Sequence, residues 1–146
     1  MSASLDVSKE LYEELLALEH AFWTGDLNTF QDHVDDGCVL LVRPDWDGIY
    51  AQEDVGMYQV KDSWAEVQIT VTGMLQPIPG IVFMLYEVTA TGHLFTEEAE
   101  ELEGKKRKSR KSCKVVANSS YVNRDGVWKL VAHQRSQDPS RFAYRK

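Results

Sequence analysis

The 146-residue sequence contains few cysteines and no long hydrophobic run. Its two cysteines, Cys38 and Cys113, cannot build a disulfide framework and do not have the spacing of metal ligands. No segment reaches the roughly 18 apolar residues of a membrane-spanning helix. The first residues also lack the basic and apolar regions of a secretory signal. We therefore expect a soluble, cytoplasmic protein that has no metal site and no membrane partner.

Several catalytic and cofactor motifs are absent as well. The sequence has no GxGxxG phosphate loop, no HExxH zinc motif and no GxSxG nucleophile elbow. Cys38 lies in the apolar segment CVLLV, where a buried thiol behaves as a small hydrophobic group rather than as a nucleophile. We therefore expect neither a bound cofactor nor nucleophilic catalysis.

The net charge is −7, which argues against nucleic acid as a partner. The charges are unevenly distributed, because EEAEELE at 97–103 is followed by KKRKSRKSCK at 105–114. We predict a single domain over residues 1–146, with a charged, solvated hairpin insertion at about 94–114. The alternative for this insertion is that residues 97–111 form an arm that docks another protein.

The hydrophobic pattern changes from helical to strand-like along the chain. Helical spacing connects Leu11, Leu15, Leu18 and Phe22, with Ser8 as a cap and Gly25 as a stop. A short helix after Asp26 and a third helix within 50–64 follow. Four β-rich runs then begin at Val67: VQITVTGML, IVFMLYEVTAT, CKVVANSSYVN and VWKLVAHQRS. This order predicts an α+β fold, with three N-terminal helices on the concave face of a strongly curved antiparallel sheet, a cone-shaped barrel.

The last run, DGVWKLVAHQRSQDP at 125–139, begins apolar and ends polar. Strict alternation would place His133 and Arg135 on the face of Val127 and Lys129, opposite Trp128. A polar strand end either frays into water or lines a polar pocket. In a pocket, His133 and Arg135 would orient an anion or a carbonyl group.

Other side chains are candidates for the same pocket. Glu87 is a lone acid in the apolar run MLYEVTA, and Asp45 and Asp47 lie in a loop. His133 or one of these acids would serve a general acid–base reaction, although a structural histidine and an outward-facing Glu87 are the alternatives. The candidate ligand-binding residues are Trp64, Arg135, His133, Tyr50, Trp23, Asn118 and Ser119.

Two segments resemble known families. TGDLNTFQDHVDDGCVLL and DGVWKLVAHQRS, with a third short helix between them, resemble the nuclear-transport-factor-two-like (NTF2-like) superfamily, which includes SnoaL-like polyketide cyclases and ketosteroid isomerases. DGVWKLVAHQRSQDP and DVGMYQVKDSW are similar to the association (hub) domain of calcium/calmodulin-dependent protein kinase II. The resemblance implies that Arg135 and Trp64 help to line a polar pocket. Two further pocket positions of the hub family, an arginine and a histidine, are occupied by Ser119 and Gly56.

Two functions follow as expectations. The first is a non-catalytic module that binds a small apolar or acidic ligand in a polar-ended cavity and assembles as a homodimer or larger ring. The second is a SnoaL-like cyclase, isomerase or hydratase that acts on a small carbonyl compound by general acid–base chemistry. Steroid isomerisation is disfavoured, because Leu18 and Leu41 or Val42 replace the tyrosine and the aspartate of that family.

Overall fold

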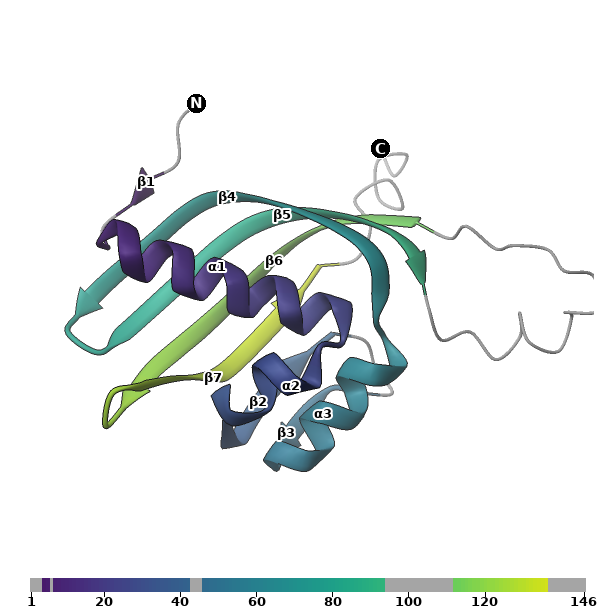
Figure 1. Ribbon diagram of the computed structural model, residues 1–146, viewed down its shortest axis with the longest axis horizontal. Helices are drawn as coiled ribbons and strands as arrows, with labels where there is room; N and C mark the ends of the chain where they lie inside the picture. Colours follow the sequence, from purple (N-terminus) through teal and green to yellow (C-terminus); the bar gives the residue numbers. More distant parts are fainter. Residues whose placement is uncertain (1–3, 6, 43–45, 94–111, 137–146) are drawn as a thin grey trace, which may run out of the picture.

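The computed structural model describes residues 4–5, 7–42, 46–93 and 112–136 (Figure 1). The elements, in chain order, are β1 (Ser4–Leu5), α1 (Lys9–Thr24), α2 (Leu27–Phe30), the 3₁₀ helix η1 (Gln31–His33), β2 (Val34–Leu41), β3 (Gly48–Tyr50), α3 (Gln52–Lys61), β4 (Trp64–Ile78), β5 (Ile81–His93), β6 (Ser112–Arg124) and β7 (Val127–Arg135). No helix in these ranges is long and apolar enough to cross a membrane. The predicted insertion lies outside the described residues up to position 111, so its docking role stays a prediction.

The described strands form one sheet in the order β1-β4-β5-β6-β7-β2-β3. The predicted α+β class is confirmed, but the purely antiparallel sheet is wrong, because β1 pairs with β4 and β2 pairs with β7 in parallel. The sheet is open, with β1 and β3 at its edges, and does not close into a barrel. In Figure 1, α1 lies across the long central strands, while α2 and α3 lie toward one end of the sheet.

Helix α1 forms where its sequence signals predict. Its first turn is capped by Ser8, whose Oγ accepts a hydrogen bond from the backbone N–H of Leu11, and it ends at Gly25 with a φ of 75°. The inner face of the helix buries Leu15, Phe22 and Trp23 against the sheet. Each such side chain stabilises the fold by about 1.5–3 kcal/mol, so this face anchors the helix.

A β-bulge changes the direction of side chains along β7. Tyr121 of β6 pairs with Leu130, but the next residue back, Ser120, pairs with Ala132, so that Val131 is an extra residue. Strict alternation is therefore wrong for this strand, because Leu130 and His133 are both buried on the inner face. The bulge is what turns the polar end of β7 toward α1.

Strand β2 also begins earlier than its sequence indicates. Asp36-Gly37 has the composition of a turn before the apolar segment 38–42, but β2 already pairs with β7 at Val34. Gly37, with a φ of 82°, lies where the register with β7 shifts between Val34 and Val39. The positive φ therefore bends a continuous strand rather than separating two elements.

A comparison of two glycines distinguishes the cost of backbone strain from the cost of steric overlap. Gly25 and Gly37 both have positive φ, but a Cβ at position 25 would lie 2.7 Å from the Cβ of Ser63, whereas one at position 37 meets nothing within 4 Å. Gly37→Ala is expected to cost about 1–2 kcal/mol of unfolding free energy from strain alone. Gly25→Ala is expected to cost about 1–3 kcal/mol more from overpacking. Urea denaturation of both variants checks this difference, and equal losses would contradict it.

Candidate functional site

A carboxylate, Glu19, lies in the middle of the apolar face of α1. It is four residues after Leu15 and four before Trp23, so all three side chains share one side of the helix. The side chain is fully buried. Sequence reasoning missed Glu19, although an acid inside an apolar stripe was the signal that could have revealed it.

Hydroxyl groups from two strands hold the Glu19 carboxylate. Tyr121 on β6 donates to Oε1 at 2.7 Å, and Ser119 on the same strand donates to Oε2 at 2.5 Å. Tyr86 on β5 also donates to Oε2, while its own oxygen accepts a hydrogen bond from Trp23 Nε1 at 2.8 Å. Because both oxygens accept hydrogen bonds from hydroxyl groups of the protein, the buried charge is compensated.

His133 connects this carboxylate to Arg135. Its Nε2 accepts a hydrogen bond from Arg135 Nε at 2.8 Å, so this nitrogen carries no proton. The proton of the neutral ring is therefore on Nδ1, which is 2.8 Å from Ser119 Oγ and 3.3 Å from Glu19 Oε2. Glu19, Trp23, Tyr86, Ser119, Tyr121, His133 and Arg135 form what we call the buried polar cluster.

The buried environment shifts the pKa values of His133 and Glu19. Burial lowers the pKa of His133, and the positive charge of Arg135 lowers it further. The hydrogen bond with Glu19 works in the opposite direction but does not outweigh burial. Burial works to raise the pKa of Glu19, but hydrogen bonds from His133, Ser119 and Tyr86 outweigh it and hold the pKa below its usual range. The cluster therefore contains an ionised carboxylate and a neutral imidazole at neutral pH.

Arg135 ends the cluster and meets α3. Its Nη1 donates to Asp62 Oδ2 at 2.7 Å, and the Tyr58 hydroxyl donates to the same oxygen at 2.7 Å. The guanidinium carbon lies 3.5 Å from the ring centroid of Trp23, a cation–π contact. The Arg135 side chain is 8% exposed and that of Asp62 is 14% exposed, so solvent reaches the cluster at this ion pair.

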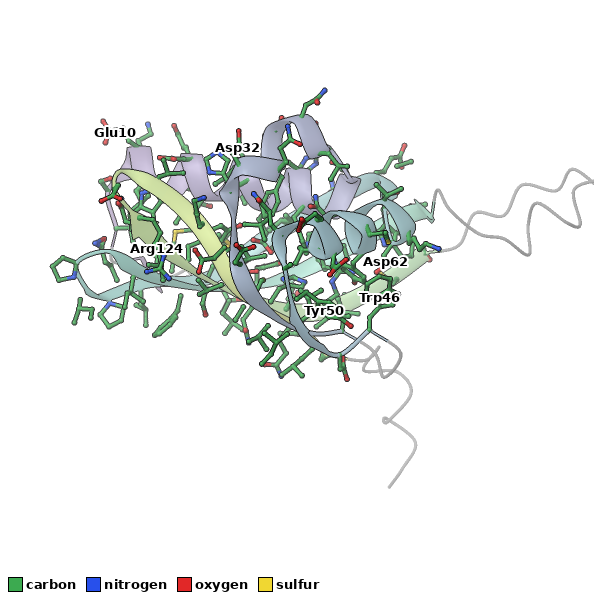
Figure 2. The ribbon with its side chains drawn as sticks, turned by 90° about the horizontal axis from the view of Figure 1, so that it is seen from below. Glu10, Asp32, Trp46, Tyr50, Asp62 and Arg124 are labelled. Atoms are coloured by element: carbon green, nitrogen blue, oxygen red, sulfur yellow. The ribbon has the colours of Figure 1, made fainter. Side chains whose placement is uncertain are left out.

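A row of aromatic side chains leads away from the exposed end of the cluster. The ring of Trp46 packs against Tyr58, with centroids 5.4 Å apart, and against Tyr50, with centroids 5.7 Å apart. Figure 2 shows Trp46, Tyr50 and Asp62 at the same end of the molecule. Trp46 and Tyr50 are half-buried, and Trp46 is connected to the ion pair through Tyr58, whose hydroxyl donates to Asp62.

The structure brings together only part of the predicted site. Trp23, Ser119, His133 and Arg135 meet in the cluster, whereas Asp62 was not predicted. Tyr50 lies near the ion pair through Trp46, and Trp64 is buried at the start of β4. The described part of the chain contains no group of three or more His, Cys, Asp or Glu side chains that could hold a metal.

Two predicted residues lie on the outer face of the sheet, which is the stated alternative for Glu87, and two others add nothing to the cluster. Glu87 and Asn118 are exposed, because alternation along β5 and β6 places them opposite the buried Tyr86 and Ser119. Asp47 is exposed and accepts a hydrogen bond from the Val42 N–H, and Asp45 lies outside the described residues. Glu87 therefore cannot act as an acid or base beside His133.

The thiol of Cys38 is buried, as its apolar neighbours predict. Burial, and then the negative charges of Asp35 and Glu19, raise its pKa to about 12. The thiol is therefore protonated at neutral pH and does not act as a nucleophile.

Comparison with known proteins identifies the fold. No family model and no curated protein matches the chain. Solved structures of NTF2-like proteins do match, and they include an NTF2-like protein of unknown function from Shewanella oneidensis (11% identity, TM-score 0.58, covering 88% of this chain and 97% of that chain). The chain therefore has the NTF2-like fold, as the sequence resemblance implied.

Two further solved structures are similar to this chain. A ketosteroid isomerase-like protein from Erwinia carotovora atroseptica has 13% identity and a TM-score of 0.65, covering 89% of this chain and 97% of that chain. The association domain of Caenorhabditis elegans CaMKII, the kinase of the hub family, has 12% identity and a TM-score of 0.60, covering 88% of this chain and 94% of that chain. At these identities the likeness shows the fold alone.

The neutral state of His133 makes stability depend on pH. The unfolded chain binds a proton at His133 near pH 6.5, but the folded chain resists it, so this contribution is complete above pH 6.5 and is lost as the pH falls. We expect the unfolding free energy to decrease below pH 6.5 by up to about 1.4 kcal/mol per pH unit from this group. His133→Gln should remove this part of the slope, as measured by urea denaturation between pH 5 and 7.5.

His20 offers the control for this measurement. It is an exposed histidine on α1 with no part in the cluster, so His20→Gln shows the effect of removing a histidine elsewhere in the protein. A His133→Gln protein with the same pH dependence as the wild type would contradict the neutral, desolvated imidazole.

Proposed function

We propose that the chain is a non-catalytic module that binds a small acidic ligand and assembles with copies of itself. The observation that supports ligand binding is the Arg135–Asp62 ion pair, which lies at the solvent-accessible end of the buried polar cluster. The guanidinium is held in place by His133 and Trp23, so it is already oriented for a carboxylate.

The hydrogen bonds within the buried polar cluster argue against catalysis. Both oxygens of Glu19 accept hydrogen bonds within the protein, and both nitrogens of His133 have protein partners. A general base must reach the substrate proton directly or through one water molecule. Here the imidazole and the carboxylate instead hold one another and Arg135 in position.

The chemistry of the ion pair favours an acidic ligand. Arg135 donates through a planar fork, which suits a carboxylate, and Asp62 already supplies such a group from the protein. A ligand carboxylate would take the place of Asp62 on the guanidinium. The half-buried rings of Trp46 and Tyr50 would cover the apolar part of the same ligand.

Self-assembly is supported by an apolar outer sheet face. Leu75, Phe83, Leu85 and Val116 are 39–49% exposed on β4, β5 and β6, on the side away from α1. Leu75 and Phe83 are paired across β4 and β5, so their side chains form a continuous patch. A second copy of the chain would remove this patch from water. The similar C. elegans protein is itself an association domain by name.

An enzyme of the SnoaL-like type is the second candidate. The observation in its favour is the 3.3 Å distance between Glu19 Oε2 and His133 Nδ1, a carboxylate–imidazole pair. In this mechanism Arg135 would leave His133 Nε2, which would then accept a proton from a small carbonyl compound. Turnover of a carbonyl substrate that is lost in His133→Gln would favour this candidate over the first.

The ligand site can be tested with benzoate as a probe and benzyl alcohol as its uncharged counterpart. We expect calorimetry to detect benzoate but not benzyl alcohol, because only the former has a carboxylate for Arg135. Loss of a charged hydrogen bond is worth about 1.5–3 kcal/mol, so Arg135→Gln should weaken benzoate binding about 10- to 150-fold. Asp62→Asn should strengthen it, because the competing carboxylate is removed.

Arg124 supplies the matched control for Arg135. It pairs with Asp35 on the surface, so Arg124→Gln removes an arginine without touching the cluster. This variant should bind benzoate like the wild type. Binding of benzoate to Arg135→Gln at wild-type affinity would disprove the role of the guanidinium.

The outer sheet face can be tested by sedimentation equilibrium. We expect a mass of twice 16.7 kDa or a larger multiple for the wild type. Phe83→Lys should weaken self-association at least about tenfold, since burying such a side chain is worth about 1.5–3 kcal/mol. Ile49→Lys, on a side chain that is 73% exposed on β3, is the control for an added charge. A monomeric wild type, or a Phe83→Lys protein that associates normally, would refute this interface.

A further inference from the structure

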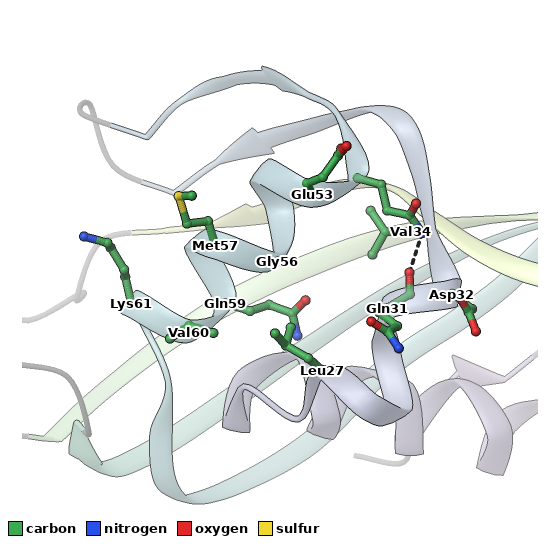
Figure 3. A pocket seen from close by; sticks show the side chains of 11 residues that line it. Leu27, Gln31, Asp32, Val34, Glu53, Gly56, Met57, Gln59, Val60 and Lys61 are labelled. Carbon is green, nitrogen blue, oxygen red and sulfur yellow. Dashed lines mark hydrogen bonds between the residues drawn. The ribbon is translucent and has the colours of Figure 1, made fainter.

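A groove of about 580 Å³ lies between the segment α2–η1 and α3 (Figure 3). Its walls are mainly apolar, with Leu27 and Val34 on one side and Met57 and Val60 on the other. No member of the buried polar cluster lines it, so it is separate from the Arg135 site. Its size is typical of sites for small organic ligands.

The side chain of Gln59 makes this groove unusual. Gln59 is 1% exposed, and within the described ranges neither its Nε2 nor its Oε1 has a hydrogen-bond partner. In Figure 3 the side chain extends from α3 toward α2, into the groove. A buried amide without partners is destabilising, because it has lost its hydrogen bonds to water and gained none. Such a group therefore requires an explanation.

Another glutamine in the groove has its partner. Gln52 Nε2 donates to the carbonyl oxygen of Gln31, which connects α3 to η1. Both glutamines line the groove, but only Gln59 lacks a bond. Gln52 therefore serves as a comparison for Gln59, because it is a glutamine of the same groove whose side-chain amide is hydrogen-bonded.

Leu27 of α2 packs against α3 close to Gln59. A Cβ placed on Gly56 would be 3.6 Å from Leu27 Cδ2, so Leu27 rests on α3 at this glycine. Gly56 and Gln59 are three residues apart and share that face of the helix. Leu27 is only partly buried and lines the groove together with Gln59, so a ligand in the groove would reach the amide by displacing the Leu27 side chain.

We propose that the groove binds a small neutral molecule with a cis amide, such as a lactam, through paired hydrogen bonds with Gln59. A primary amide places a donor and an acceptor side by side, and a cis amide presents the complementary acceptor and donor. The apolar walls suit a hydrocarbon ring. Charged side chains on the lining are Asp32, Glu53 and Lys61, and their net negative charge disfavours an anion.

The direct test uses δ-valerolactam as the probe and N-methyl-δ-valerolactam as its counterpart without the donor. We expect δ-valerolactam to shift the side-chain amide signals of Gln59 in nitrogen–proton correlation NMR spectra. The N-methyl compound should bind at least about tenfold more weakly, because one hydrogen bond of the pair is lost. Equal binding of the two compounds, or no binding of δ-valerolactam, overturns the proposal.

Three variants locate the site. Gln59→Met keeps the length of the side chain, and it should abolish δ-valerolactam binding while raising the melting temperature, since an unsatisfied amide is removed. Gly56→Leu fills the groove from a helical position and should also abolish binding, with Gln59 intact. Gln52→Met is the matched control and should leave binding unchanged.

The variants also distinguish a ligand site from a hydrated amide. If an ordered water molecule satisfies Gln59, Gln59→Met will not raise the melting temperature, and δ-valerolactam will bind both proteins equally or neither. Either result rejects the proposal. None of the three variants changes a residue of the Arg135 site, so all three should bind benzoate like the wild type. A failure of the benzoate experiment can therefore be distinguished from a failure of the lactam experiment.

Discussion

Within the described residues, the interior is organised around the buried, ionised carboxylate of Glu19. Glu19 lies on the face of α1 that packs against the sheet, and hydroxyl groups of Tyr86, Ser119 and Tyr121 surround its carboxylate. An ionised carboxylate in an apolar interior is tolerated only when such donors replace water. The helix can therefore occupy one position and one rotation on β5 and β6, since any other would separate the charge from its donors.

The same charge determines the orientation of the arginine. Glu19 accepts from Ser119, Ser119 accepts from His133 Nδ1–H, and His133 Nε2 accepts from Arg135, so every hydrogen bond in this chain has one direction. Asp62, the residue that follows α3, then balances the guanidinium. These hydrogen bonds connect α1, β6, β7 and the end of α3. The charge on Glu19 thereby fixes the tautomer of His133, and His133 in turn orients the guanidinium of Arg135.

The sequence predicts the local features of the fold better than the long-range ones. The cap at Ser8 and the stop at Gly25 depend on neighbouring residues, so α1 was placed correctly. The bulge at Val131 and the parallel pairing of β2 with β7 depend on a partner strand far along the chain, and no local pattern signals them. The polar end of β7 predicts part of the site, but Glu19 is not among the predicted residues.

The parallel pairing of β2 with β7 has a consequence for how the chain folds. Leu40 pairs with His133, so two of the most distant strands must meet before the sheet is complete. Forming such a contact requires the closure of a very long loop, which slows folding relative to chains rich in local contacts. During synthesis, α1 emerges long before the strand that carries His133. The Glu19 carboxylate therefore stays in water until β5 and β6 have been synthesised and supply its hydroxyl donors.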